Sequence, residues 1–274
     1  MKFLDLQGAK FPALGFGTWQ LTGEQCTQAV KAAINIGYRH IDTAQIYENE
    51  GEVGQGIKNA GISRKELFVT TKIWTSNFTS ALVASSMEES LEKLGMDYVD
   101  LLLMHWPNPA IPLAETLGAM QELVKKGKTK AIGVSNFPVA LMREAVEKCK
   151  VPVACNQVEY HAMLSQKSVL NYAHGYGIIV TAYSPLGRGK LANHPLLTEI
   201  GRKYGKTSSQ IALRWLIDQS NVAAIPKAAS EKNAKVNFDI FDFELSASDQ
   251  KEINALGGDN RLINPGFAPQ WDAA

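Results

Sequence analysis

Four polar residues that could hold or transfer protons lie at the ends of short apolar runs. Asp42 closes the run YRHIDTA, and Tyr47 follows it in the loop QIYENEG. Lys72 closes LFVTTKIW, and His105 closes YVDLLLMHWP. Because the carboxyl ends of successive parallel strands meet at one mouth of an α/β barrel, these side chains are expected to converge there. Together they could deliver a proton.

The chemistry of each side chain suggests a separate task. A free phenol such as that of Tyr47 has a pKa of about 10 and is a poor acid near neutral pH. A nearby Lys72 ammonium would lower that pKa, and Asp42 would keep Lys72 charged and oriented. His105 could hold a carbonyl oxygen between its ring and Tyr47. This set suits carbonyl reduction, and without a visible metal or flavin motif a nicotinamide cofactor is expected to supply the hydride.

Taken singly, these residues have other interpretations. Lys72 on a barrel strand could form a Schiff base. Asp42 could pair with Arg39 or cap a helix, His105 could be a hydrogen-bonded core histidine, and Tyr47 could be a half-buried loop aromatic. Only the joint occurrence of the four favours catalysis.

The elements that must position these residues alternate regularly. Short apolar runs alternate with stretches of helical spacing, which is typical of repeated βα units. Strands are predicted at residues 14–18, 39–43, 67–73, 98–105, 129–137, 154–160, 178–187 and 221–228. Helices are predicted near residues 24–36, 52–59, 79–93, 112–126, 138–148, 166–174 and 207–219. No run has the charge pattern of an exposed edge strand, so a closed (β/α)8 TIM barrel is expected.

The two ends of the chain add elements to this barrel. The segments KFLDLQ and KFPALGFGT flank Gly8 and predict an N-terminal β-hairpin cap. SASDQKEINAL predicts an extra C-terminal helix, which is followed by the tail DNRLINPGFAPQWDAA. No linker or change of composition divides the chain, so residues 1–274 are expected to form a single domain.

Composition restricts the class of protein. The chain has 274 residues and 45% hydrophobic content, enough for one large core. A net charge of +1 gives no reason to expect nucleic acid or an acidic membrane as a partner. The three cysteines, Cys26, Cys149 and Cys155, show no metal-binding spacing and are expected to be free thiols. With no signal peptide or membrane span visible, a cytoplasmic location is expected.

Two longer segments resemble signatures of the aldo-keto reductase family. GYRHIDTAQIYENEGEVG, residues 37–54, is similar to the first signature, and KAIGVSNF, residues 130–137, resembles the second. KIW at Lys72 and HWP at His105 complete the likeness, which covers essentially the whole chain. The resemblance implies a (β/α)8 barrel with an N-terminal hairpin and a catalytic tetrad that matches the four residues above. A monomer is expected.

The resemblance also implies cofactor-binding positions without a Rossmann domain. The segments VSNF and CNQVEY would hold the nicotinamide carboxamide, and TAYSPLG would supply a stacking ring and the pyrophosphate loop. The first strand would border the same pocket. The positions carried over are Gly17, Thr18, Ser135, Asn136, Gln157, Tyr183, Ser184, Leu186, Gly187, Pro226, Lys227, Ser230, Lys232 and Asn237.

The third signature departs from the family pattern. The family usually reads IPKS followed by a basic residue that grips the adenosine 2′-phosphate, whereas this chain reads IPKAASEKNAKVN. Ala228 replaces the hydroxyl, and Asn233 stands where Arg is common. Lys227 remains, and Ser230 and Lys232 could supply replacement contacts. NADPH is therefore the expected cofactor, with NADH possible as a second one.

Three tryptophans just beyond strand ends, Trp19, Trp74 and Trp106, are candidates for the substrate-binding wall. They could instead merely cap the barrel core. The connection after His105 is short, so a comparatively open pocket is expected. The tail RLINPGFAPQWD resembles that of bacterial 2,5-diketo-D-gluconate reductases. This likeness implies a small-molecule carbonyl substrate, such as a keto acid, a keto sugar, methylglyoxal or another aldehyde.

Two functions from other classes stay open. A lyase could use Lys72 as an imine-forming nucleophile, but Tyr47, Gln157 and Tyr183 would then have no purpose. A redox-sensing module could bind NADPH and turn it over slowly. The compact chain shows no extra N-terminal interaction segment, which argues against this second function.

Overall fold

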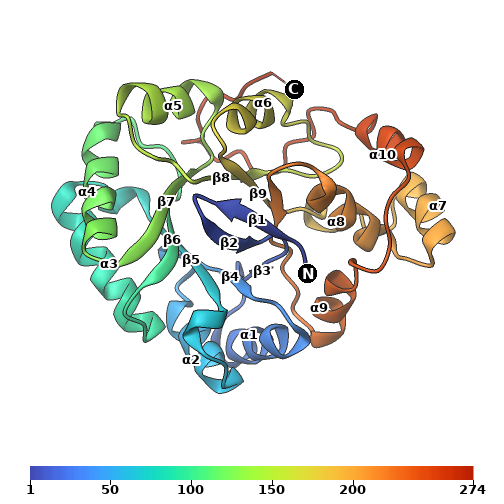
Figure 1. The fold of residues 1–274 in the computed structure, drawn as a ribbon, viewed down its shortest axis with the longest axis horizontal. Coiled ribbons are helices and arrows are strands. Elements are labelled where there is room, and N and C mark those ends of the chain that lie inside the picture. The colour runs from blue at the N-terminus through green and yellow to red at the C-terminus, as the bar shows by residue number, and fades with distance from the viewer. Residues whose placement is uncertain (274) are drawn as a thin grey trace.

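The computed structural model describes residues 1–273 and contains a curled sheet of eight parallel strands (Figure 1). The strands are β3 (Phe16–Gly17), β4 (His40–Asp42), β5 (Phe68–Ile73), β6 (Val99–Met104), β7 (Thr129–Ser135), β8 (Cys155–Glu159), β9 (Ile179–Tyr183) and β10 (Val222–Ala224). Each strand pairs with its neighbour in sequence. The two edges are linked because Gly15 N donates to Ala224 O and Ala224 N donates to Ala13 O, both at 2.8 Å. This arrangement agrees with the (β/α)8 fold expected from the sequence.

Helices surround the sheet on its outer side (Figure 1). They are α1 (Gly23–Ile36), α2 (Glu50–Ala60), α3 (Ser80–Leu94), α4 (Leu113–Lys125), α5 (Val139–Arg143), α6 (Lys167–Gly175), α7 (Pro195–Tyr204), α8 (Ser208–Asp218), α9 (Glu231–Phe238) and α10 (Ala247–Asn254). Capping explains where α8 begins. Thr207 Oγ1 accepts a hydrogen bond from Gln210 N, and Gln210 Oε1 accepts one from Thr207 N. Each side chain thus satisfies a backbone donor of the first turn.

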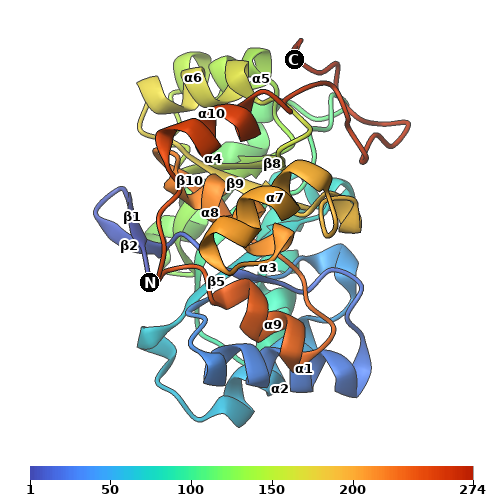
Figure 2. The same cartoon turned by 90° about the vertical axis from the view of Figure 1, so that its right-hand side faces the viewer.

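A hairpin closes the end of the barrel where the strands begin. Strands β1 (Phe3–Leu6) and β2 (Ala9–Pro12) pair antiparallel across Gln7 and Gly8, both of which have positive φ. This geometry suits a tight two-residue turn. Figure 2 shows the hairpin at one end of the molecule and the C-terminal tail at the other. The C-terminal tail thus lies at the opposite end of the barrel, where the strands finish.

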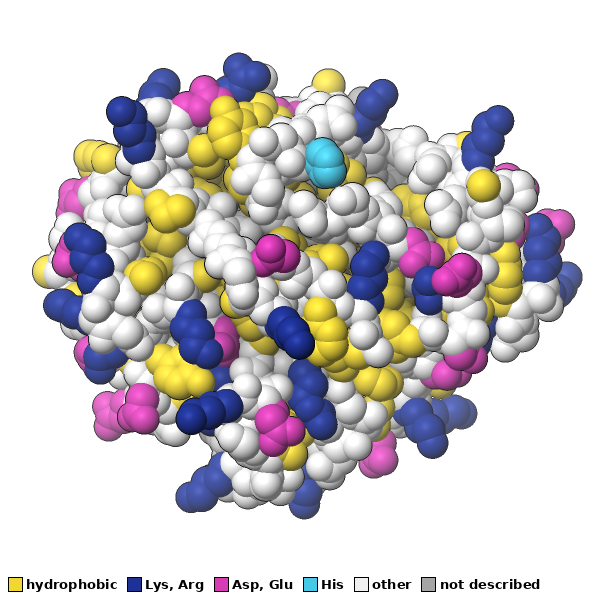
Figure 3. Space-filling model, viewed as in Figure 1, with side chains coloured by type: hydrophobic (Ala, Val, Ile, Leu, Met, Phe, Trp, Pro, Cys, Tyr) yellow, Lys and Arg dark blue, Asp and Glu magenta, His cyan; other side chains and the backbone are white. Residues whose placement is uncertain are grey.

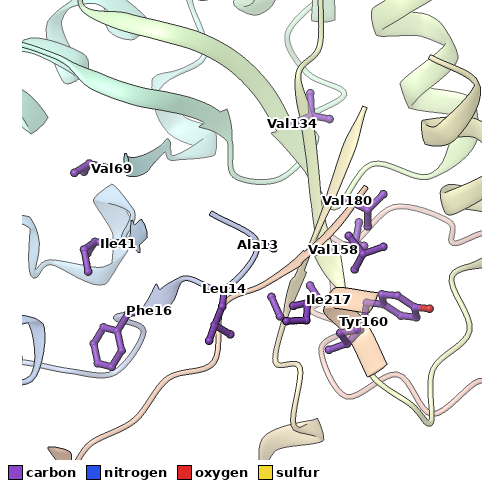
Figure 4. Close-up of a cluster of buried hydrophobic side chains, with 14 of the residues drawn as sticks. Ala13, Leu14, Phe16, Ile41, Val69, Val134, Val158, Tyr160, Val180 and Ile217 are labelled. Atoms are coloured by element: carbon purple, nitrogen blue, oxygen red, sulfur yellow. The ribbon is translucent and has the colours of Figure 1, made fainter. Parts of the chain in front are cut away.

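Strand alternation separates two apolar layers. Leu102 and Met104 of β6 pack outward in the larger cluster between sheet and helices, part of which is drawn in Figure 4. Leu101 and Leu103 point inward and share the barrel interior with Phe11 of the hairpin. Because side chains alternate along a strand, the next inward position of β6 falls just beyond its end.

The first and last strands are shorter than predicted. Only Phe16–Gly17 and Val222–Ala224 have regular strand pairing, against predictions of 14–18 and 221–228. The two segments still lie very close, since a Cβ on Gly17 would be 2.8 Å from the Ile225 oxygen. The junction between the first and last strands therefore depends on isolated backbone hydrogen bonds and on Gly17, which has no side chain and lets the two backbones lie close together.

Some helices also differ from the prediction. No helix was expected at α7, although Pro195 at its first turn and Gly205 with φ of 65° after its end are start and stop signals. No separate helix was expected at α9, which is short and buries only Ala234 and Asn237. The predicted helix at 138–148 divides into α5 and a π-helical segment, Glu144–Lys148. The C-terminal helix is present as α10.

The surface around the hairpin carries basic and acidic side chains interspersed, with no large area of one sign (Figure 3). In residues 1–273, no helix is both long and apolar enough to cross a membrane.

Candidate active site

Three neighbouring strands bring three of the predicted residues together. Asp42 ends β4, Lys72 is the last inward residue of β5, and His105 directly follows β6. Parallel pairing sets Asp42 opposite Thr70 and Lys72 opposite Leu103, so the polar side chains rise in a staggered row at the strand ends. The prediction that these residues meet at one mouth agrees with their placement.

Lys72 is fully buried and is held by three oxygen atoms. Its Nζ donates to Asp42 Oδ1 at 2.5 Å, to the Thr43 carbonyl at 2.8 Å and to Tyr47 Oη at 3.3 Å. Burial alone would lower the pKa of Lys72, but the negative charge of Asp42 and the contact with Tyr47 outweigh it and raise the pKa. The amine therefore stays charged near neutral pH.

Tyr47 is placed by a short 3-10 helix, Gln45–Tyr47, that follows β4. The Gln45 side chain fixes this turn, because its Oε1 accepts from Trp74 N at 2.9 Å and its Nε2 donates to the Ser86 carbonyl at 3.1 Å. The turn ends at Glu48, which has a left-handed conformation. The sequence analysis did not select Gln45, whose role is revealed only by its hydrogen bonds to the start of the Thr75–Asn77 turn and to helix α3.

Lys72 lowers the pKa of Tyr47 as expected, but the net pKa of Tyr47 is raised above its ordinary value. Burial raises the pKa of Tyr47, and this effect exceeds the lowering by the Lys72 ammonium. The sequence predicts an ammonium beside the phenol, but it does not show how much of the ring is buried by packing, which is partial. Lys72 still stabilises the phenolate relative to the same buried site without it.

His105 is a neutral imidazole in this environment. Burial lowers its pKa well below the ordinary value, and the charge of Lys72 lowers it further. Its ring packs edge-on against Tyr47 at 5.5 Å and against Trp74 at 5.3 Å between centroids. A neutral ring with one N–H can donate a hydrogen bond to an incoming oxygen without itself changing charge.

These residues face a cavity of about 380 Å³. Asp42, Tyr47 and His105 line it, while Lys72 lies behind them. The three tryptophans predicted for substrate binding also line it. Trp19 is 47% exposed and its ring lies 4.7 Å from that of Tyr47, whereas Trp106 is buried.

The opposite wall carries a chain of polar contacts. Tyr183 Oη donates to Asn136 Oδ1 at 2.8 Å, and Asn136 Nδ2 donates to the His105 carbonyl at 2.9 Å. Gln157 Nε2 donates to Asp42 Oδ2 at 2.8 Å. Asn136 has φ of 64°, a left-handed conformation that asparagine tolerates. Hydrogen bonds therefore join the two walls of the cavity.

Comparison with known proteins assigns the family. A sequence model of the aldo/keto reductase family matches residues 13–257. The chain belongs to this family. The glyoxal reductase of Bacillus subtilis is 43% identical over 256 residues, covering 93% of this chain and 92% of the relative. The methylglyoxal reductase DkgB of Escherichia coli O157:H7 is 39% identical over 265 residues, covering 95% and 99%.

A solved structure that carries the provisional name 2,5-diketo-D-gluconic acid reductase B superimposes on this chain with a TM-score of 0.97. The two are 45% identical, and the match covers 100% of this chain and 98% of the other. The aldose reductase of Schistosoma japonicum gives a TM-score of 0.91 at 33% identity, covering 96% and 94%. The chain is accordingly an oxidoreductase.

Half of the predicted cofactor positions of the reductase line the cavity: Gly17, Thr18, Asn136, Gln157, Tyr183, Ser184 and Lys227. Ser135 lies just behind, where its hydroxyl donates to the Gln157 carbonyl at 2.8 Å. The other predicted positions are outside the wall of the cavity: Leu186, Gly187, Pro226, Ser230, Lys232 and Asn237.

Ser230 has a structural role in the reductase. Its hydroxyl accepts from Asn233 N at 3.3 Å and caps α9. Ala228 and Asn237 are buried, while Lys227 and Lys232 are exposed. The first turn of α9 therefore presents Lys232 to solvent, outside the wall of the cavity.

Sequence reasoning missed several residues of the reductase cavity. Ile46, Pro185, Arg188, Ile225 and Ile263 also line it. Ile46 and Ile225 adjoin predicted residues, so proximity in sequence could have found them. Ile263 comes from the C-terminal tail, and nothing in the sequence shows that the tail folds back over the barrel.

Asn49 supports the site from outside the cavity, and the sequence analysis did not predict this role. It is fully buried, its Nδ2 donates to the Thr18 and Leu21 carbonyls at 2.9 and 2.8 Å, and its Oδ1 accepts from Thr43 Oγ1 at 2.7 Å. It thereby ties the first strand of the reductase to the loop that carries Tyr47. Within residues 1–273 there is no cluster of three or more histidine, cysteine or carboxylate side chains that could hold a metal ion.

Proposed function

We propose that this oxidoreductase uses NADPH to reduce small aldehydes and ketones to alcohols, with Tyr47 as the general acid. The observation that carries the proposal is the contact of the Tyr47 hydroxyl with Lys72, itself paired with Asp42, at the wall of the cavity that His105 faces. The reductases that match over nearly the full chain support the reaction class.

The proposed steps follow from the groups present. A substrate carbonyl oxygen accepts hydrogen bonds from Tyr47 Oη and from the neutral His105 ring. As negative charge develops on that oxygen, Tyr47 transfers its proton, and the fixed Lys72 ammonium stabilises the resulting phenolate. Asp42 keeps the ammonium in place by its short ion pair. The preorganised charges act without moving during the reaction.

The polar wall fits a nicotinamide cofactor. Tyr183 offers an aromatic ring to the cavity, and the amides of Asn136 and Gln157 lie beside it. Such a cofactor, when bound, supplies the hydride. Ser184 begins a turn with positive φ, and Lys227 extends from the rim, so both could meet the phosphates. These residues would hold and orient the ring next to Tyr47.

Two features support small dicarbonyl substrates such as glyoxal and methylglyoxal, with 2,5-diketo-D-gluconate as a larger candidate. The first is that the relatives named above are called reductases of these compounds. The cavity is small and partly walled by Trp19, Trp74 and Trp106, which can exclude water and orient a short carbon chain.

The experiment that tests the function is a survey of NADPH and NADH oxidation with these compounds and with simple aldehydes and keto acids. Turnover of at least one dicarbonyl with NADPH is expected. Absence of turnover with the whole panel, despite tight NADPH binding, would favour the slow redox sensor instead. A Lys72 lyase is disfavoured because an imine requires an accessible neutral amine, and Lys72 is buried and charged.

The reduction is expected to show little dependence on pH near neutrality. Reduction needs protonated Tyr47, whose raised pKa keeps the proton on until alkaline pH, and the lowered pKa of His105 keeps its ring neutral. We therefore expect kcat/KM to be level from about pH 6 to 9 and to fall at higher pH. An inflection near neutral pH that disappears in His105→Gln would contradict a neutral imidazole.

Cofactor choice is expected to depend on Lys227 and Lys232. Each would contribute a charge-assisted contact to the 2′-phosphate, so Lys227→Ala and Lys232→Ala should weaken NADPH binding by about tenfold to a hundredfold and change NADH binding little. Titration by quenching of tryptophan fluorescence measures both affinities. Lys235→Ala, on the same helix, is the matched control. Equal losses for both cofactors would show that these lysines do not recognise the phosphate.

We further propose that residues 1–274 act as one domain and as a monomeric cytoplasmic enzyme. The family match over residues 13–257 and the backbone bonds that join the first and last strands support one closed (β/α)8 barrel. The free thiols of Cys26, Cys149 and Cys155 suit a reducing compartment.

A further inference from the structure

We propose that Glu159 is a positioning residue that fastens the C-terminal tail, residues 259–273, over the mouth of the barrel and so sets the affinity for substrate. This inference rests on the reductase function proposed above. It concerns a buried carboxylate that the proton-transfer chemistry does not use.

Glu159 ends strand β8 and points inward, two residues beyond Gln157 of the cavity wall. Its carboxylate accepts three backbone hydrogen-bond contacts from the tail. Leu262 N donates to Oε1 at 2.9 Å and to Oε2 at 3.1 Å, and Ile263 N donates to Oε2 at 2.9 Å. The ring Nε2 of His161 lies 3.2 Å from Oε1. The side chain is 0% exposed, so it is the tail that completes its environment.

The burial of this carboxylate makes the attachment specific. A carboxyl group removed from water is unfavourable unless donors replace its hydration, and backbone N–H groups aimed at a carboxylate are strong donors. When the tail is seated, Leu262 and Ile263 supply these donors. When the tail lifts, Glu159 regains water but the two amides lose their acceptor. Glu159 thus acts as a latch between the barrel and the tail.

Other bonds hold the ends of the tail but not its part next to the site. Before the latch, Ser165 N donates to the Gly258 carbonyl at 2.8 Å, and Asn260 Nδ2 donates to the Met163 carbonyl at 3.1 Å. Beyond it, Asp272 Oδ2 accepts from Val139 N at 2.9 Å. Between these two ends, the tail is attached to the end of a barrel strand by the hydrogen bonds of Leu262 and Ile263 to Glu159.

The latched segment contributes directly to the substrate side of the cavity. Ile263 lines it, and Phe267 packs edge-on against Trp74 at 6.1 Å and against Trp106 at 5.5 Å between centroids. Trp271 lies 6.1 Å from Trp106. Phe267 is nevertheless 53% exposed, so its apolar contacts alone hold it loosely. The position of this aromatic wall therefore depends on the latch.

The position of Glu159 also indicates whether its loss should change the affinity for substrate or the affinity for cofactor. Glu159 is opposite Tyr183 in the pairing of β8 with β9, so it could instead act on the cofactor face. However, the Tyr183 hydroxyl bonds to Asn136 and not to Glu159. Loss of the latch should therefore change substrate affinity more than cofactor affinity.

The test uses Glu159→Gln, which keeps the shape of the side chain but turns one acceptor oxygen into a donor. Hydrogen exchange of the tail amides should become about tenfold to a hundredfold faster. KM for methylglyoxal should rise about tenfold or more while kcat falls less than KM rises, and the NADPH dissociation constant should stay within about twofold. Glu122→Gln on α4 is the control, since it replaces an exposed carboxylate whose hydrogen-bond partner is Lys125 and not the tail.

Two further variants keep the test decisive. Leu262→Pro removes a donor from the tail and leaves the barrel unchanged, so it should reproduce the exchange and KM effects even if Glu159→Gln folds poorly. In a Phe267→Ala/Trp271→Ala background, Glu159→Gln should raise KM much less, because the wall that the latch positions is gone. Unchanged tail exchange, or a loss confined to NADPH binding, would overturn the inference. Tail exchange needs no turnover, so it reports on the latch even if the proposed reaction is wrong.

Discussion

Tyr47→Phe is expected to lower kcat/KM for carbonyl reduction by about two to four orders of magnitude. The substitution removes only the hydroxyl, which contacts Lys72 at 3.3 Å and faces the cavity. Because this group acts on the oxygen that gains charge in the transition state, its loss should reduce kcat more than it affects binding. Steady-state kinetics with NADPH and methylglyoxal measure the effect.

The control for Tyr47→Phe is the cofactor affinity. The polar contacts of the opposite wall, from Tyr183, Asn136 and Gln157, do not involve the Tyr47 hydroxyl, so NADPH should bind the variant nearly as well as the native enzyme. Tyr183→Phe removes a matched hydroxyl from the same cavity and should leave proton transfer in place. If Tyr47→Phe turned over at close to the native rate, Tyr47 would not be the acid.

Lys72→Met is expected to be the second most damaging change. Methionine retains most of the bulk but deletes the ammonium that stabilises the Tyr47 phenolate. A neighbouring opposite charge typically changes an acid dissociation constant by a factor of about ten to a thousand, so the buried phenol should become a weaker acid by that factor. Reduction should slow accordingly, and the alkaline fall of the pH profile should move to higher pH.

Asp42→Asn is the comparison for Lys72→Met. It loosens the ammonium but leaves it beside Tyr47, because the Thr43 carbonyl still accepts from Lys72 Nζ. Its activity should therefore be reduced less. Lys72→Met also leaves the Asp42 carboxylate buried without its partner, which is destabilising by about 3–5 kcal/mol, so thermal unfolding must show that both variants fold. A folded Asp42→Asn that is less active than a folded Lys72→Met would reverse the proposed roles.

The sequence alone determines the parts of the site that follow from strand periodicity. Asp42, Lys72 and His105 come at the ends of consecutive apolar runs, and parallel strands place such positions side by side. The repeated alternation of strands and helices likewise predicts a barrel. Local patterns carry this information because each depends on residues close in sequence.

The net direction of the Tyr47 pKa depends on tertiary structure. The sequence predicts that a phenol and an ammonium lie near each other, whereas the burial that raises the pKa of Tyr47 depends on neighbours such as the Trp19 and His105 rings that pack against it. Desolvation depends on every group that excludes water from a site. These groups come from distant parts of the chain, so no short segment of the sequence predicts the total desolvation of Tyr47.

The position of the C-terminal tail is determined only by the tertiary structure. RLINPGFAPQWD has no regular periodicity, so the sequence gives no position for it relative to the barrel. The structure seats Leu262 and Ile263 on Glu159, about a hundred residues earlier in the chain, and thereby completes the cavity with Ile263. A buried carboxylate at the end of β8 has no recognisable partner in sequence, because its donors are backbone amides, which every residue other than proline possesses.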